Sequence, residues 1–133
     1  MKIVDVEGIG PAYAEKLEAI GISTTDDLLM AGGSAGGRER VAAQSGISGK
    51  LILEWVNHVD LMRIDGVGSE YADLLEAAGV DSCAELSHRN AKSLAETFRE
   101  LDMARNTVRD IPGEAVIQRW IDQAKDLDKV VTH

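Results

Sequence analysis

The sequence predicts an all-α fold, and three observations carry this prediction. Strong helix formers dominate the composition, and only two of the 133 residues are Pro. No stretch shows the sustained alternation of apolar and polar residues that is typical of a strand. Apolar residues instead recur at helical spacing, and glycines separate these segments. We therefore expect a helical bundle.

Composition limits the class of protein. The apolar content of 44% is sufficient for a globular core, in one compact domain or in two small units that share a core. The single Cys83 excludes an internal disulfide and fits a reducing compartment. Residues 1–5 lack the apolar run of a signal peptide, and no run approaches the length of a membrane span. We expect a cytoplasmic protein without membrane contact.

The net charge is strongly acidic. The chain carries 14 basic and 23 acidic residues, for a formal charge of −9. Such a charge repels nucleic-acid phosphates unless a local basic face overrides it. Nucleic acid is therefore disfavoured as a partner.

A Gly-hydrophobe-Gly hairpin opens each half of the chain, and each hairpin is followed by a predicted helix. The hairpin residues are Gly8, Ile9 and Gly10 in the first half, and Gly66, Val67 and Gly68 in the second. We expect both glycines of each pair to allow a sharp turn where a Cβ would clash, with the central apolar residue in the core. Free N–H groups and the positive dipole end of the next helix would then form an anion-binding geometry.

The first predicted helix follows directly from the hairpin. Pro11 suits a first helical turn, and Tyr13 and Leu17 recur on one face. Gly21 ends this helix, and Ile22 is placed to pack back on it.

The rest of the first half is predicted to be helical with one interruption. Thr24 and Asp27 form an N-cap pair for a short helix. Residues 32–37 are Gly-rich and lack the Gly-Lys-Ser/Thr ending of a nucleotide-binding loop, so we expect a plain connector. A short helix over 38–45 and a long helix that carries Trp55 complete this half.

The second half repeats this order. Ser69 is the expected N-cap of a helix that carries Tyr71. Ser82 and Glu85 predict a capping box, and Asn90 is the expected cap of the next helix. A last helix carries Trp120 in an apolar stripe.

An internal repeat is the most specific feature of the sequence. Residues 8–28 align with 66–86 at a shift of 58, and nine of 21 positions are identical. Trp55 matches Trp120 at a shift of 65, so the second copy contains an insertion of about seven residues. We predict two units, 1–62 and 63–133, packed together as one compact domain.

The repeat also suggests how the Trp helices pack. The helix of Trp55 precedes the second hairpin, so by symmetry the helix of Trp120 should sit against the first hairpin. It could do so within its own chain or in a neighbouring chain of a symmetric dimer. The tail, residues 129–133, would then be ordered.

The repeated pattern hydrophobe-acidic-Gly-hydrophobe-Gly-x-x-Tyr-Ala resembles helix-hairpin-helix motifs. The whole chain is also similar to a family of small, mostly bacterial proteins of unassigned function that are built from tandem helix-hairpin-helix units. The residues that carry this resemblance are the run 7–17, Trp55-Val56-Asn57-His58, Asp60-Leu61-Met62-Arg63-Ile64 and Val130-Val131-Thr132. The resemblance implies a tandem bundle of the helix-hairpin-helix, or SAM-like, type.

The resemblance also implies a site. In DNA-binding members, hairpin N–H groups grip a phosphate, an early Lys or Arg of the next helix assists, and a monovalent cation sits on hairpin carbonyls. Here the positions for the base hold Ala12 and Glu70. Lys16 has Leu74 as its counterpart. The local charge is −2 from Lys2 to Glu18 (two bases, four acids) and −3 from Arg63 to Glu76 (one base, four acids).

Other candidate chemistry is weak. Cys83 has no His beside it in sequence, and His58, His88 and His133 lack metal-ligand spacing, so we expect no enzyme and no metal. We interpret Trp55 and Trp120 as core anchors rather than base-stacking platforms, because their neighbours are acidic. Tyr13 and Tyr71 are the matching anchors on the hairpin helices.

One stretch is basic. Between His88 and Arg109, five bases oppose three acids, for a charge of +2. The bases are Arg89, Lys92, Arg99, Arg105 and Arg109. They form either an amphipathic helix with mixed surface charge or a small patch for a phosphate or an acidic partner.

Together these observations predict a non-enzymatic binding module for protein interaction, scaffolding or self-association. The alternative is weak, sequence-independent binding of a DNA or RNA backbone at the hairpins. We expect no cofactor, except for a candidate monovalent cation at a hairpin.

Overall fold

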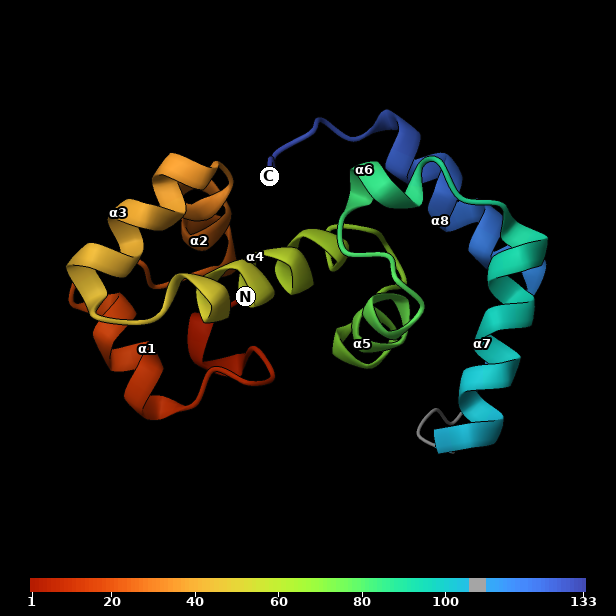
Figure 1. The fold of residues 1–133 in the computed structure, drawn as a ribbon, viewed down its shortest axis with the longest axis horizontal. Helices are drawn as coiled ribbons and strands as arrows, with labels where there is room; N and C mark the ends of the chain where they lie inside the picture. Colours follow the sequence, from red (N-terminus) through yellow and green to blue (C-terminus); the bar gives the residue numbers. More distant parts are fainter. Residues whose placement is uncertain (106–109) are drawn as a thin grey trace. The chain divides into compact units, whose positions relative to one another are not determined.

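The computed structural model describes the backbone of residues 1–105 and 110–133, and the side chains of 1–102 and 110–133. Within these ranges every named element is helical, so the all-α prediction is confirmed (Figure 1). In the described part of the chain, one isolated bridge joins Lys2 and Thr24. The elements are η1 (Ile3–Asp5), α1 (Pro11–Glu18), α2 (Thr25–Gly32), α3 (Ala35–Ser45), α4 (Gly49–Leu61), α5 (Ser69–Ala77), α6 (Cys83–Leu86), α7 (Ala91–Arg105) and α8 (Glu114–Asp126).

The chain forms two units, each with its own core. The first unit comprises Met1–Asp60 together with Lys129–His133, and the second comprises Leu61–Asp128. The first core draws buried apolar residues from η1, from α1 to α4 and from Val131 of the tail, which is therefore packed rather than frayed. The second core draws on α5 to α8, with Phe98 fully buried.

The hairpin helices end in the same way in both units. Gly21 and Gly79 have φ of 89° and 90°, a left-handed conformation that favours glycine. The next residue then turns back: the Ile22 N–H donates to the Leu17 carbonyl at 3.0 Å, as the Val80 N–H does to Leu75 at 2.9 Å. This Schellman geometry satisfies carbonyls that the helix leaves open and buries Ile22, as predicted.

Side-chain caps start several of the other helices. The Thr24 hydroxyl accepts from the Asp27 N–H at 3.1 Å, and Asp27 accepts in return from the Thr24 N–H at 3.1 Å. The predicted N-cap pair is therefore present, and the two bonds make it a capping box. Asn90 caps α7 by accepting from the Ser93 N–H at 3.0 Å. Ser69, the expected cap of α5, is instead its first helical residue, and Gly68 is the cap.

The predicted partner of each Trp helix was wrong. Trp55 of α4 lies behind the first hairpin, next to Gly8, and Trp120 of α8 lies behind the second, next to Gly66. Each Trp helix therefore packs on the hairpin of its own unit and within its own chain. The symmetry argument failed because it assigned α4 to the hairpin that follows it, whereas the indole packs on the hairpin that precedes it.

The Gly-rich stretch is not a connector. Gly32 ends α2, and Gly37 lies inside α3, so only residues 33–34 join the two helices. A Cβ on Gly32 would stand 2.9 Å from the Val56 side chain, and one on Gly37 would overlap the Ala31 carbonyl. These glycines allow the backbone of one segment to approach another closely. A Gly-rich sequence therefore does not by itself distinguish close packing from a flexible connector.

Only the first glycine of each hairpin pair needs the absence of a Cβ, contrary to the prediction. Gly66 has φ of 93°, and its Cβ would stand 3.3 Å from the Trp120 indole nitrogen, whereas nothing lies within 4 Å of a Cβ on Gly68. We expect Gly66→Ala to lower the free energy of unfolding by about 1–3 kcal/mol. Urea unfolding followed by circular dichroism measures the change.

The matched control for this substitution is Gly68→Ala. It should cost less than about 1 kcal/mol, because the only loss is that of a better N-cap residue. Equal losses in the two variants would contradict the structural difference between the two glycines.

Acid titration offers a second test of the fold. The backbone N–H groups of Ser23 and Thr24 donate to Asp27 and hold its pKa below the ordinary value of 3.8. Because the folded-state pKa is lowered, this contribution to stability is present above pH 3.8 and is lost as the pH falls through the folded-state pKa. Asp27→Asn should therefore flatten the acid limb of the urea midpoint against pH. An unchanged acid limb would contradict this assignment.

Candidate functional site

Each hairpin is a four-residue turn with glycine at its third position. The Ile9 N–H donates to the Val6 carbonyl at 3.0 Å, and the Val67 N–H donates to the Ile64 carbonyl at 3.0 Å. Gly8 has φ of 89°, the conformation that the third position of a type II turn requires. The turn directs the central apolar residue inward, so Ile9 is 2% exposed, as predicted.

An aromatic pair supports each turn from behind. The Trp55 indole nitrogen lies 3.7 Å from the position of a Cβ on Gly8, and the Tyr13 and Trp55 ring centroids are 5.1 Å apart. Tyr71 and Trp120 repeat this contact at 5.3 Å. Both Trp side chains are buried, and each belongs to the core of its own unit. Edge-to-face and tilted contacts of this kind stabilise aromatic pairs.

The helix that follows each hairpin begins without a side-chain cap. Gly10 and Gly68 are the N-cap residues of α1 and α5, and neither can supply a capping oxygen. The first N–H groups of both helices therefore have no side-chain acceptor from the cap residue. This is the geometric feature that an anion could use.

The charges around the first hairpin are mostly acidic. Glu7, Glu15 and Glu18 are exposed beside or after the turn. Lys16 is the only base of α1, the helix that follows this hairpin. Its ammonium lies 6.0 Å from the centroid of the Tyr13 ring. An acidic rim of this kind weakens any attraction for phosphate.

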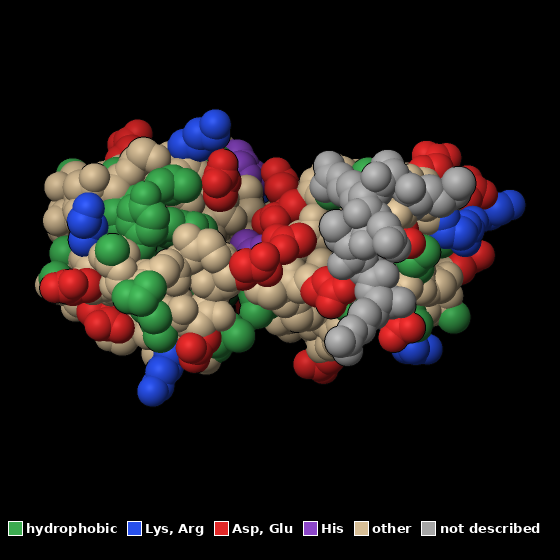
Figure 2. Space-filling view, turned by 90° about the horizontal axis from the view of Figure 1, so that it is seen from below, with side chains coloured by type: hydrophobic (Ala, Val, Ile, Leu, Met, Phe, Trp, Pro, Cys, Tyr) green, Lys and Arg blue, Asp and Glu red, His purple; other side chains and the backbone are tan. Residues whose placement is uncertain are grey.

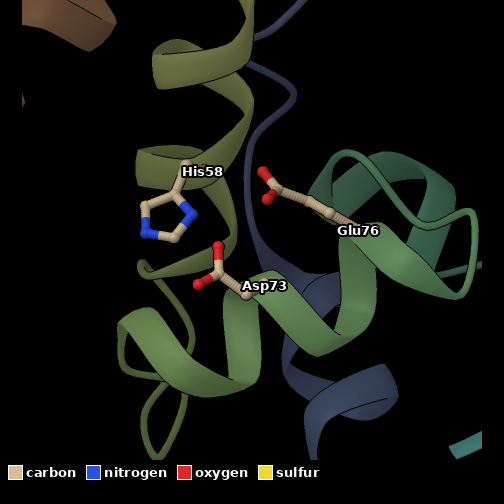
Figure 3. Close-up of side chains that lie close together, drawn as sticks. All are labelled: His58, Asp73 and Glu76. Carbon is tan, nitrogen blue, oxygen red and sulfur yellow. The ribbon is translucent and has the colours of Figure 1, made fainter. Parts of the chain in front are cut away.

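The second hairpin is more acidic still. Asp65, Glu70 and Asp73 are exposed, and the close-up shows Asp73 and Glu76 on α5, one helical turn apart (Figure 3). His58, which the same figure labels, belongs to α4 and is 5% exposed. Arg63, the one base before this turn, donates to the Asp128 carbonyl at 3.1 Å. Its guanidinium is therefore already in use within the second unit.

Sequence reasoning missed a side chain that brackets the second hairpin. The Asp65 N–H donates to the Gln123 carboxamide oxygen at 3.0 Å, and the Gln123 amide donates to the Asp65 carbonyl at 3.4 Å. Gln123 lies one turn after Trp120 on α8, so the same helix holds the turn by an indole and by an amide. Only its spacing from Trp120 could have indicated this role.

Arg38 is the second residue that was missed. It is 7% exposed, although it stands at the start of the short helix predicted over 38–45 and Arg is ordinarily exposed. The guanidinium donates to the carbonyls of Gly32 at 3.0 Å and Gly33 at 2.8 Å, and to that of Thr132 at 2.6 Å. No local pattern predicts the last contact, because it joins residues 94 positions apart.

The basic stretch is only partly described. Arg89 pairs with Glu85 at 3.6 Å, while Lys92 and Arg99 are exposed on one face of α7 with Glu96 between them. The side chain of Arg105 and the whole of Arg109 lie outside the described residues. In the described part, acids therefore alternate with the bases, which favours a surface of mixed charge over a continuous patch.

The thiol and the two histidines that the sequence offered as candidates for catalysis or metal binding, Cys83, His88 and His133, lie apart in the chain and differ in exposure. Cys83 is 3% exposed and packs in the second core. His88 and His133 are exposed.

These features define an all-helical protein with two units, each held by a glycine turn and a buried Trp. The chain belongs to the family described as "Domain of unknown function (DUF4332)", which matches residues 7–127. Comparisons with curated proteins and with solved structures give no match. Among the described residues, none of the helices is both long and apolar enough to cross a lipid bilayer.

The environment of Tyr71 generates a prediction for the site. Burial raises its pKa above the ordinary value of 10.0, and the charges of Asp110 and Glu70 raise it further. In a Tyr13→Phe chain, the ultraviolet absorbance of tyrosinate should therefore titrate above pH 10.0. The neutral phenol stabilises the fold below that pH, and this contribution is lost as the pH rises through the folded-state pKa.

The control for this titration is the same Tyr13→Phe chain in denaturing urea. Its tyrosine should return to the ordinary value. A folded chain that titrates at or below the unfolded one would contradict the described surroundings of the phenol.

Proposed function

We propose that this chain is a non-enzymatic binding module made of two helix-hairpin-helix units, and that it acts in protein interaction or scaffolding in the cytoplasm. One observation carries the proposal. The helix start at each hairpin holds acidic or neutral residues where a phosphate binder places a base: Ala12 in the first unit and Glu70 in the second. The hairpins then serve to hold helices together rather than to bind a polyanion.

Surface chemistry supports the same proposal. On the face drawn in Figure 2, Asp and Glu side chains are scattered over the described surface, between apolar and other side chains. Met30, on α2, is 87% exposed, and Val4 and Ile111 are each 38% exposed. Large apolar side chains on an acidic surface suit contact with another protein better than contact with nucleic acid.

Weak binding of a DNA or RNA backbone is the second candidate. The absence of side-chain caps at Gly10 and Gly68 favours it, because both helices then offer backbone N–H groups to an anion. A monovalent cation on the hairpin carbonyls would belong to this candidate. The local charges of −2 and −3 oppose it.

Charge reversal at the hairpins separates the two candidates. We expect the natural chain to leave a labelled DNA duplex unbound at about 0.15 M salt, as measured by fluorescence anisotropy. The double variant Ala12→Lys, Glu70→Lys should bind the duplex at low salt at least about tenfold more tightly than the natural chain, with affinity that falls as salt rises. This gain is expected because the backbone geometry is present and the base is absent.

The control double variant Glu39→Lys, Ala43→Lys makes the same total charge change at two exposed positions of α3, a helix that follows neither hairpin. An equal gain there would show that net charge alone is responsible. Tight duplex binding by the natural chain at about 0.15 M salt would overturn the ranking of the two candidates. The capture of protein partners from a native lysate should also be unchanged by nuclease treatment. If partners are lost after nuclease, the nucleic-acid candidate is favoured.

A further inference from the structure

The segment Lys129–His133 is bound to the first unit as an extended peptide would be. Val131 is 2% exposed and belongs to the first core, and Val130 packs against the same core. The Thr132 N–H donates to the Gly33 carbonyl at 2.8 Å, while the Thr132 carbonyl accepts from Arg38 at 2.6 Å. One buried side chain and two backbone hydrogen bonds therefore fix the register of this segment.

The surface that receives the segment is shaped for a main chain. Gly33, between α2 and α3, lies so close to the segment that its Cβ would stand 2.6 Å from the Val130 carbonyl and 3.1 Å from the Val130 side chain. Gly33 is buried in the structure. We call the surface formed by Gly32, Gly33 and Arg38 the tail groove.

Electrostatics and burial both favour an occupant of the tail groove. A buried guanidinium is costly unless acceptors surround it, and Arg offers five N–H donors. The carbonyls of Gly32 and Gly33 supply two acceptors at the C-terminal, negative end of α2. Thr132 supplies the third acceptor. Without the segment, water would have to replace this acceptor, and the apolar surface that Val131 covers would be exposed to solvent.

We propose that the tail groove is an exchangeable peptide site, and that a second copy of this chain can supply its own Lys129–His133 there in trans. The proposal gives a partner to the proposed interaction role and rests on that role. None of the contacts described above depends on which copy supplies the segment, since every one is made with the first unit.

Connectivity favours exchange. The segment is bound to the first unit but is attached in sequence to α8 of the second, through Leu127 and Asp128. Leu127 has extended backbone, with φ of −84° and ψ of 140°, so the chain leaves the helix there as a strand-like arm. An arm that leaves one unit and binds another is the element that protomers exchange at low cost. A second copy is the favoured occupant because it carries the same Val and Thr in the same register.

A peptide probe tests the groove. The full-length Val131→Asp chain should leave its own groove empty, because a carboxylate does not enter the apolar core. A labelled peptide of residues 127–133, with both ends blocked, should bind this variant at least about tenfold more tightly than the natural chain, whose own tail competes. The same peptide with Val131→Asp should not bind. Failure of a folded Val131→Asp chain to bind the natural peptide in large excess would overturn the proposal.

Mixing two full-length variants tests exchange between copies. The Arg38→Met chain has a weakened groove and an intact segment 129–133. The Val131→Asp chain has an intact groove and a segment that cannot bind there. Light scattering after size exclusion should find a one-to-one complex in the mixture at concentrations where each variant alone is monomeric. If both remain monomeric in the mixture, the second copy is overturned as the occupant. If Val131→Asp does not fold, Thr132→Pro takes its place, because it removes the N–H that donates to Gly33 and leaves Val131 intact.

The two proposals fail in different ways. Partners that survive nuclease treatment would uphold the interaction role even if the peptide never binds. Duplex binding by the natural chain would remove that role, while peptide binding to Val131→Asp would still identify the groove.

Discussion

The glycine turn backed by an indole is the constraint on which each unit depends. With φ near 90°, Gly8 and Gly66 reverse the chain in four residues, and the turn buries the apolar residue that follows. The next helix must then start at a fixed place, and the Trp indole packs next to the turn glycine. Local backbone conformation thus determines where the hairpin helix and the Trp helix meet.

Elements governed by local rules could be predicted from the sequence. Gly21 followed by Ile22 forms a Schellman ending, and Thr24 with Asp27 forms a capping box, because both depend on residues within one turn of helix. The helical stripes and the buried aromatic anchors were also predictable, since periodicity reports directly which face is buried.

Contacts between distant segments could not be predicted in this way. The repeat showed that Trp55 and Trp120 are equivalent, but it did not say which hairpin each one supports, because both hairpins have the same sequence pattern. Residues 32–37 have the composition of a linker, yet Gly32 and Gly37 allow helices and backbone to approach closely. The burial of Arg38 depends on a tail segment 94 residues away, and a side chain of this type is ordinarily exposed.

The repeat preserves residues of the turn and the core, and it has diverged at the positions of the hairpin helix where a phosphate binder would place a base. The positions shared by the two copies include the turn glycine, Tyr13 with Tyr71, and Leu17 with Leu75, all of which support the turn or the core. Lys16 is exposed in the first unit, but its counterpart Leu74 is 6% exposed in the second. A function that used both hairpins alike to bind phosphate would retain a base at these positions. Their divergence therefore agrees with the proposed scaffold role of the turns and with the proposal that recognition uses a surface of one unit only, such as the tail groove.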